Sequence, residues 1–336
     1  MKTVDLLRML LITLILLGSV LLANKIYLNQ KNASIIEEKT IAISPKVIFK
    51  ELSEEEKETI YEQCMRSPYH AQDTKIAFQE LIGKYKNKNI SFIFEDIKNN
   101  YSYDKSPSVV YYGASIIKLL DAVYLLEKAN IGEAHLSEKI TYQTKHMHAY
   151  SYGLEKYQVG DKISIEELIY YALNISDNAA HKMLVDYIGI ENLKEYAESL
   201  GITLTINSEE YFGNMKPEYA HKILKKAYDL ISLKNKNSKL LEKAMTSDYY
   251  NSLNFDTIKV LHKYGLTNQY YHDIGIYNDS TYPYLITVFT KEAYQDYETL
   301  IHDLHKDIYQ IYLENISLKK TYCSKIENDL LPTKKV

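Results

Sequence analysis

The fold of this chain is decided by one stretch, YYGASIIKLLDAVYLLEK at residues 111–128. From Ile116 onward apolar residues fall on nearly every face, which is typical of a helix that is buried all round. Ser115 lies at the start of this helix, and Lys118 follows one turn later. Because residues three apart on a helix are neighbours, we expect the lysine amine to lie beside the serine hydroxyl.

Ser115 and Lys118 together have the chemistry of an activated nucleophile. A lysine in a mostly apolar pocket is pushed toward its neutral form, and a neutral amine can take a proton from serine. Gly113 lets backbone or substrate come close to the hydroxyl. The alternative is a helix cap with an amine that reaches water, because Ser-x-x-Lys also occurs at Ser102/Lys105 and Ser317/Lys320.

Length and charge set broad limits on function. The 336 residues suffice for one large domain or two lobes, and the formal net charge of −4 gives no reason to expect nucleic acid as a partner. Cys64 and Cys323 either form one disulfide or remain two unpaired thiols, because spacing alone does not show that they meet. We expect no metal site, since His146 and His148 lack a third ligand and read as exposed loop residues.

The first residues have the pattern of an exported protein. A short positive end precedes an unbroken run of small and apolar residues at 9–23, as in a signal peptide or a membrane anchor. Because no small-residue cleavage site follows, we predict an uncleaved anchor within residues 1–28. The rest of the chain would then lie on the extracytoplasmic side of the cell membrane. Residues 29–70 are predicted to form a spacer and an N-terminal helix.

The order of elements predicts a mixed α/β (α+β) domain at residues 71–336. An antiparallel sheet takes strands from both ends of the domain, in a sheet lobe at about 71–110 and 255–320. Helices at both ends flank this sheet, and an all-helical lobe at about 111–250 is inserted between its strands. The strands are expected near residues 89–96, 100–103, 257–263, 273–277 and 284–290, with the last helix near 296–316.

Two further polar motifs follow Ser115-Ile116-Ile117-Lys118. Ser176-Asp177-Asn178 lies at a corner between two helices, and Lys263-Tyr264-Gly265 lies at the end of a predicted strand. In this order the three motifs resemble the penicillin-recognising serine enzymes. The resemblance is strongest to the class A β-lactamase-like serine hydrolases, whose signature is Ser-x-x-Lys, Ser-Asp-Asn and Lys-Thr-Gly. It covers about residues 76–316 and implies a β-lactamase/transpeptidase-like fold with no cofactor.

The resemblance implies a catalytic role for each matching residue. Ser115 would attack a carbonyl and form an acyl-enzyme, and Lys118 would take its proton. Ser176 would relay a proton to the leaving nitrogen, while Asn178 would bind the substrate amide. Lys263 would favour the acidic end of the substrate and the Ser176 hydroxyl.

The resemblance also implies how a substrate is held. The backbone N–H groups of Ser115 and Leu266 would form the oxyanion hole, and Gly265 would leave room for substrate along the strand. Tyr264 stands where Thr or Ser usually binds the substrate carboxylate, so this pocket is altered. Glu210 is the candidate for the loop glutamate that drives deacylation in class A enzymes, with a solvated carboxylate as the alternative. The loop looks short for that role, so fast antibiotic hydrolysis is not expected.

The leading prediction is a monomeric surface serine hydrolase that acts through an acyl-enzyme on a β-lactam or a peptidoglycan peptide. One alternative is a D-alanyl-D-alanine carboxypeptidase or transpeptidase, which would hold a long-lived penicillin adduct. The other is a non-catalytic wall-binding or sensing ectodomain, whose cellular role would survive Ser115→Ala.

Overall fold

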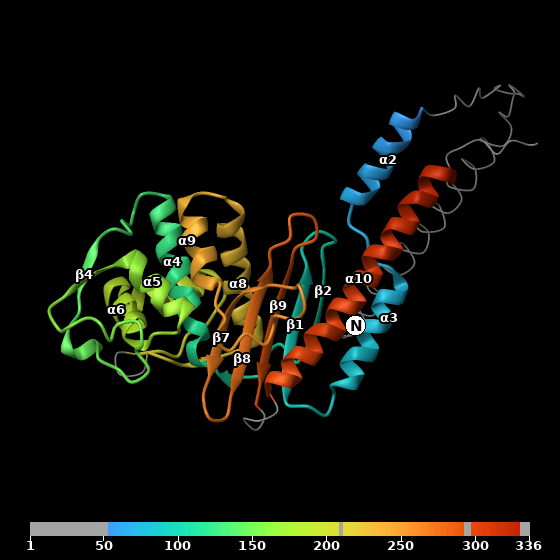
Figure 1. The fold of residues 1–336 in the computed structure, drawn as a ribbon. Helices are drawn as coiled ribbons and strands as arrows, with labels where there is room; N and C mark the ends of the chain where they lie inside the picture. Colours follow the sequence, from blue (N-terminus) through green and yellow to red (C-terminus); the bar gives the residue numbers. More distant parts are fainter. Residues whose placement is uncertain (1–52, 208–210, 292–296, 330–336) are drawn as a thin grey trace, which may run out of the picture. The chain divides into compact units, whose positions relative to one another are not determined.

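The structure is a computed structural model that describes residues 53–207, 211–291 and 297–329 (Figure 1). These residues all belong to one compact unit, Ser53–Leu331. The predicted anchor at 1–28, most of the predicted spacer and Glu210 lie outside the described residues. Within the described part of the chain, no helix is both long and apolar enough to cross a membrane.

A five-stranded antiparallel sheet forms the centre of the unit, in the order β2-β1-β9-β8-β7. Its middle strand, β9, is buried along its whole length because neighbouring strands and both helical layers cover it. The predicted sheet built from both ends of the chain is therefore confirmed. The strands are β1 (Ile90–Asp96), β2 (Tyr101–Lys105), β7 (Leu261–Leu266), β8 (Tyr271–Tyr277) and β9 (Tyr284–Thr290).

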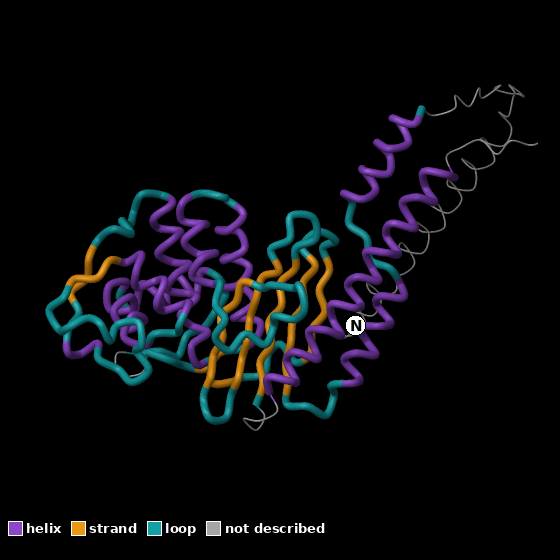
Figure 2. Tube along the Cα trace, viewed as in Figure 1, coloured by secondary structure: helices purple, strands orange, loops and turns teal. Residues whose placement is uncertain are grey.

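The last helix and the second described helix pack on one face of this sheet, as Figure 2 shows, whereas the first described helix packs along the last one. Their core is largely aromatic; Phe78, Phe94 and Tyr312 are among its buried rings. A disulfide between Cys64 and Cys323 joins the first described helix to the last, which settles the alternative left open by the sequence. The helices are α2 (Glu54–Arg66), α3 (Gln72–Lys84) and α10 (Tyr297–Asp329).

The inserted lobe packs on the other face around a separate aliphatic core. It contains two short strand pairs in addition to its helices, so it is not entirely helical. The helices are α4 (Lys118–Asn130), α5 (Ile165–Asn174), α6 (Asn178–Ile188), α7 (Ile190–Ser199), α8 (Pro217–Ser232) and α9 (Lys236–Met245). The strand pairs are β3 (Tyr111–Tyr112) with β6 (Asn214–Met215), and β4 (Lys139–Thr141) with β5 (Lys162–Ser164).

Two local predictions were wrong. Strand β7 begins at Leu261 rather than at residue 257, because the chain turns at Asp256 (φ 46°) and pairs Phe255 with Ile258. Lys263 therefore lies inside the strand and not at its end. His146 is buried rather than exposed, because its ring accepts a hydrogen bond from the Gln143 N–H and contacts Asp186.

Candidate active site

Ser115 lies where the chain enters the helical lobe. A single 3₁₀ turn, η1 (Ala114–Ile117), precedes α4, and Ala114 has the left-handed φ of 47° needed to turn from β3 into it. Ser115 is half-buried, whereas the first turns of the helix behind it, residues 118–123, are fully covered. Among the residues that the structure describes, none is hydrogen-bonded to the Ser115 hydroxyl. The expected hydrogen bond between the Lys118 amine and this hydroxyl is therefore not formed; the amine contacts Ser176 and Asn178 instead.

Lys118, one turn after Ser115, is fully buried and points to the corner before α6. Its Nζ donates to the carbonyl of Ser176 and to Oδ1 of Asn178, both at 2.6 Å, and lies 3.2 Å from Ser176 Oγ. Burial lowers the pKa of Lys118 to about 7, although Asp177 and Asp121 raise it. A neutral amine has two N–H groups for the two short contacts and keeps a lone pair that can accept a proton.

Lys263 reaches the same hydroxyl from the sheet. Its Nζ lies 3.0 Å from Ser176 Oγ and 2.8 Å from the Tyr264 carbonyl, and its side chain is also fully buried. Burial, and then the charge of Lys118, lower the pKa of Lys263 well below its usual range, while Asp273 raises it. Ser176 Oγ thus lies between two amines, a position that allows it to pass a proton between them.

The corner that carries Ser176 is fixed by Asp177. Its carboxylate caps α6 through the Ala180 N–H (2.8 Å) and accepts from the N–H groups of Gly153 and Leu154. Ser176 itself has a left-handed φ of 59°, which this bracing supports. Asp177 therefore has a structural role, as its position at the N-cap of α6 indicates.

Asn178 is already engaged on both sides of its amide. Its Oδ1 binds Lys118, and its Nδ2 donates to the Ala149 carbonyl at 3.0 Å and approaches His148 Nδ1 at 3.2 Å. A substrate amide would have to displace the 148–149 loop from the Nδ2 group. The sequence did not indicate this contact, because it joins residues about 30 positions apart.

Strand β7 is the free edge of the sheet, and η1 packs beside it. A Cβ on Gly265 would lie 3.0 Å from both the Gly113 carbonyl and Ile116 Cγ1, so this close approach requires glycine. The Thr267 N–H bonds the Tyr270 carbonyl at the β7–β8 turn. Because hydrogen-bonded positions alternate along an antiparallel strand, the N–H of Leu266 points away from β8. This N–H is therefore not used by the β7–β8 pairing.

Tyr264 is nearly buried and lies over Lys263. The ring centroid is 4.1 Å from the Lys263 Nζ, the hydroxyl is 3.5 Å from the Ile175 carbonyl, and a second ring, that of Tyr250, packs at 5.0 Å. Burial raises the pKa of Tyr264 to about 12. Tyr264 thus covers Lys263, a role that the sequence did not predict.

An aromatic ring from the loop between α7 and α8 lies next to Lys118. The Phe212 centroid is 5.4 Å from Lys118 Nζ and 4.9 Å from the ring of His181. Glu210, two residues earlier, is not described. Phe212 excludes water from the amine and so contributes to its burial.

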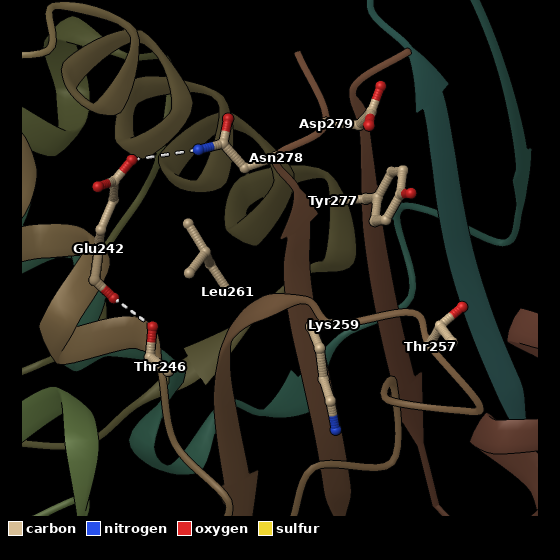
Figure 3. Close-up of a pocket in the computed structure, with 8 residues that line it drawn as sticks. All are labelled: Glu242, Thr246, Thr257, Lys259, Leu261, Tyr277, Asn278 and Asp279. Carbon is tan, nitrogen blue, oxygen red and sulfur yellow. Dashed lines mark hydrogen bonds between the residues drawn. The ribbon is translucent and has the colours of Figure 1, made fainter. Parts of the chain in front are cut away.

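Elsewhere, the described residues offer no competing centre. No group of three potential metal ligands occurs among them. A hollow of about 410 Å³ lies between α9 and the start of β7, lined by Glu242, Lys259, Asn278 and five other residues (Figure 3). Asn278 already donates to Glu242 there at 3.1 Å, and no predicted site residue lines this hollow.

Known proteins share this architecture. The TLA-3 extended-spectrum beta-lactamase superposes with a TM-score of 0.63 at 20% identity, covering 71% of this chain and 99% of that one. A point mutant of PBP-A, solved as an acyl-enzyme complex with penicillin G, gives 0.64 at 18% identity, covering 74% and 99%. A class A beta-lactamase from Bacteroides cellulosilyticus gives 0.62 at 20%, covering 72% and 99%.

These structures share the fold, while no curated protein matches the sequence. The family assignment comes from a sequence model of the beta-lactamase enzyme family, which matches residues 73–312 and so spans more than half of the chain. This range contains all three motifs around Ser115, Ser176 and Lys263. The chain belongs to the beta-lactamase enzyme family.

Proposed function

We propose that this protein is an extracytoplasmic serine hydrolase that forms an acyl-enzyme at Ser115 with a β-lactam or a related peptidoglycan-type amide. The observation that carries the proposal is the meeting of two buried amines, Lys118 and Lys263, on the hydroxyl of Ser176. The half-buried Ser115 lies one turn from the first of them. A neutral amine, a relay hydroxyl and a nucleophile are the parts that amide acylation needs.

In the proposed reaction, the neutral Lys118 amine takes the proton of Ser115 as its Oγ attacks the amide carbonyl. Negative charge then develops on the carbonyl oxygen, which the N–H groups of Ser115 and Leu266 would stabilise. The C–N bond breaks as Ser176 gives its proton to the leaving nitrogen, and Lys118 returns a proton to Ser176. The acyl group remains on Ser115.

Deacylation is proposed to be slow. It requires a base that activates water, and the described residue of the α7–α8 loop that covers Lys118 is Phe212, whose ring cannot act as a base. This observation favours the second candidate, a D-alanyl-D-alanine carboxypeptidase or transpeptidase, as an alternative to a fast lactamase. An extracytoplasmic site of action is supported by the Cys64–Cys323 disulfide, since disulfides persist in oxidising compartments.

Intact-mass spectrometry after incubation with penicillin tests the proposal. The wild type should gain one penicilloyl group, and Ser115→Ala should gain none. A long-lived adduct would favour the peptidase, and rapid loss with turnover of a chromogenic cephalosporin would favour the lactamase. A wild type that stays unmodified would contradict both and favour a binding or sensing ectodomain, whose cellular role Ser115→Ala would leave intact.

A further inference from the structure

Behind Lys118 lies a buried Asp–His pair that the motifs do not include. Asp121 follows Lys118 by one turn of α4, and His181 follows Asn178 by one turn of α6. His181 Nδ1 and Asp121 Oδ2 are 2.5 Å apart, and both side chains are fully buried. The contact between Lys118 and Asn178 is thus followed, one turn deeper, by a second polar contact between the same two helices.

Lys263 has a counterpart of the same kind on the sheet. His262 precedes it on β7, and Asp273 lies opposite Tyr264 on β8. His262 Nδ1 and Asp273 Oδ1 are 2.7 Å apart, again with both side chains fully buried. The two pairs are placed differently with respect to the lysines. Asp121 is one turn from Lys118 on the same helix, whereas Asp273 and His262 lie on the face of the sheet opposite to the Lys263 side chain, because side chains alternate along a strand.

The second nitrogen of each ring binds the backbone of a segment that covers a lysine. His181 Nε2 lies 3.1 Å from the Tyr211 carbonyl, next to Phe212, the residue whose ring covers Lys118. His262 Nε2 lies 3.1 Å from the carbonyl of Ser247, three residues before Tyr250, whose ring packs on Tyr264. Carbonyl oxygens only accept, so each ring carries a proton on Nε2.

We propose that the Asp121–His181 and Asp273–His262 pairs are positioning groups for the two lysines. The Asp121–His181 pair keeps the negative end of a buried dipole one turn from Lys118, while the Asp273–His262 pair acts on Lys263 across the sheet. Each pair also fixes the segment that covers its lysine. The proposal rests on the function proposed above, because it assigns the two pairs to the acylation chemistry of that site. Asp121 Oδ1 has no hydrogen-bond partner among the described residues. Burial raises the pKa of Asp121, and the charges of His181 and Lys118 oppose that shift.

The charges around each amine agree with this assignment. Lys118 faces Asp121 on its own helix, Asp177 and His181 from the corner and α6, and Lys263 from β7. Both carboxylates raise the pKa of Lys118 against burial, which lowers it.

Lys263 faces Lys118 from α4 and the phenol of Tyr264, and Asp273 acts on it from the opposite face of the sheet. Here Asp273 raises the pKa, against burial and the charge of Lys118. Without the paired carboxylates, both amines would lose protons at still lower pH.

The test is NMR of the lysine ¹³Cε signals against pH, in wild type, Asp121→Asn and Asp273→Asn. Asparagine keeps the shape and can donate its amide N–H to Nδ1 of a neutral ring, so both variants should fold. Asp121→Asn should lower the titration midpoint of Lys118 by about 1 pH unit, and Asp273→Asn should lower that of Lys263 by a smaller amount because Asp273 acts from across the sheet. The other lysine should move less and in the opposite direction, because charge on one amine opposes charge on the other.

Each variant is the matched control for the other. A folded variant whose own lysine keeps its wild-type midpoint would overturn the proposal. If a variant does not fold, ¹⁵N spectra of the wild-type imidazoles decide: His181 and His262 should both carry a proton on Nε2, and a ring without one would overturn it. None of these readouts needs turnover. A wild type that fails to react with penicillin would therefore contradict the proposed function without contradicting the role of the two pairs.

Discussion

Lys118 and Lys263 are alike in burial and differ in the charges around them. Both amines are fully covered, and both contact Ser176 Oγ. Two carboxylates support the charge of Lys118, whose pKa is lowered by burial only to about 7. Lys263 has one carboxylate and is further opposed by the charge of Lys118. Because burial is the main cause of the lowered pKa in both lysines, the comparison teaches that their charged neighbours distinguish them, with the pKa of Lys263 held well below its usual range.

The largest difference between the two lysines should appear when the Lys118 amine is removed. Lys118→Met should lower the rate of acylation by about 10²–10⁴, because no described group can replace the base at this position. The rate is measured as labelling by a fluorescent penicillin. Lys105→Met is the matched control, since Lys105 also follows a serine by three residues but binds the carbonyl of Ile90. An equal loss of acylation rate in both variants would contradict a specific role of Lys118 as the base.

Removing the hydroxyl between the two amines should have the next largest effect. Ser176→Ala should slow acylation by about 10², because the leaving nitrogen loses its proton donor while the Lys118 base remains. Ser151→Ala serves as control, since that hydroxyl only accepts from the Ala179 N–H at the same corner. Acylation of Ser176→Ala at the wild-type rate would show that the amines need no relay.

Changing Phe212, which covers Lys118, should alter the rate of deacylation. Phe212→Glu places a carboxylate near the amine and should shorten the lifetime of the penicilloyl adduct by about tenfold, because it supplies the missing base. Phe212→Leu keeps an apolar cover and should leave the lifetime unchanged. The lifetime is followed by intact mass after excess penicillin is removed. An identical lifetime in all three proteins would mean that Phe212 does not limit deacylation.

The smallest effect on the acylation rate is expected from changing Tyr264, which covers Lys263. Tyr264→Phe removes a hydroxyl whose contact with the Ile175 carbonyl is already long at 3.5 Å, while the ring over the lysine remains. Acylation should change less than about twofold if Tyr264 acts mainly as a cover. A loss of more than about tenfold would instead indicate that the phenol binds the substrate carboxylate.

The sequence predicted the parts of the site that depend on local order. The apolar run after Ser115 located α4, and the motif order placed Lys118, Ser176 and Lys263 on the elements that now bring their amines and hydroxyl together. The first Asp–His pair also has a local signal. Asp121 follows Lys118, and His181 follows Asn178, by three residues on their helices, so each pair of residues shares a helix face.

Other parts depend on contacts that local patterns do not encode. The pairing of His262 with Asp273 requires the register of the β7–β8 hairpin, which the turn between Leu266 and Tyr271 sets. The position of Phe212 beside Lys118 depends on a loop anchored by a helix from elsewhere in the lobe. His146 is buried through its contact with Asp186, forty residues away, so its loop surroundings were misleading.

The central claim is that the neutral amine of Lys118 activates Ser115, and the pH dependence of penicillin acylation tests it most directly. A base must be unprotonated, and the unprotonated fraction grows as pH rises through the pKa. The acylation rate should therefore rise between about pH 5 and pH 9 and be half-maximal near a pH of about 7. A rate that is flat or falls over this range, or an adduct that persists in Ser115→Ala, would contradict the account.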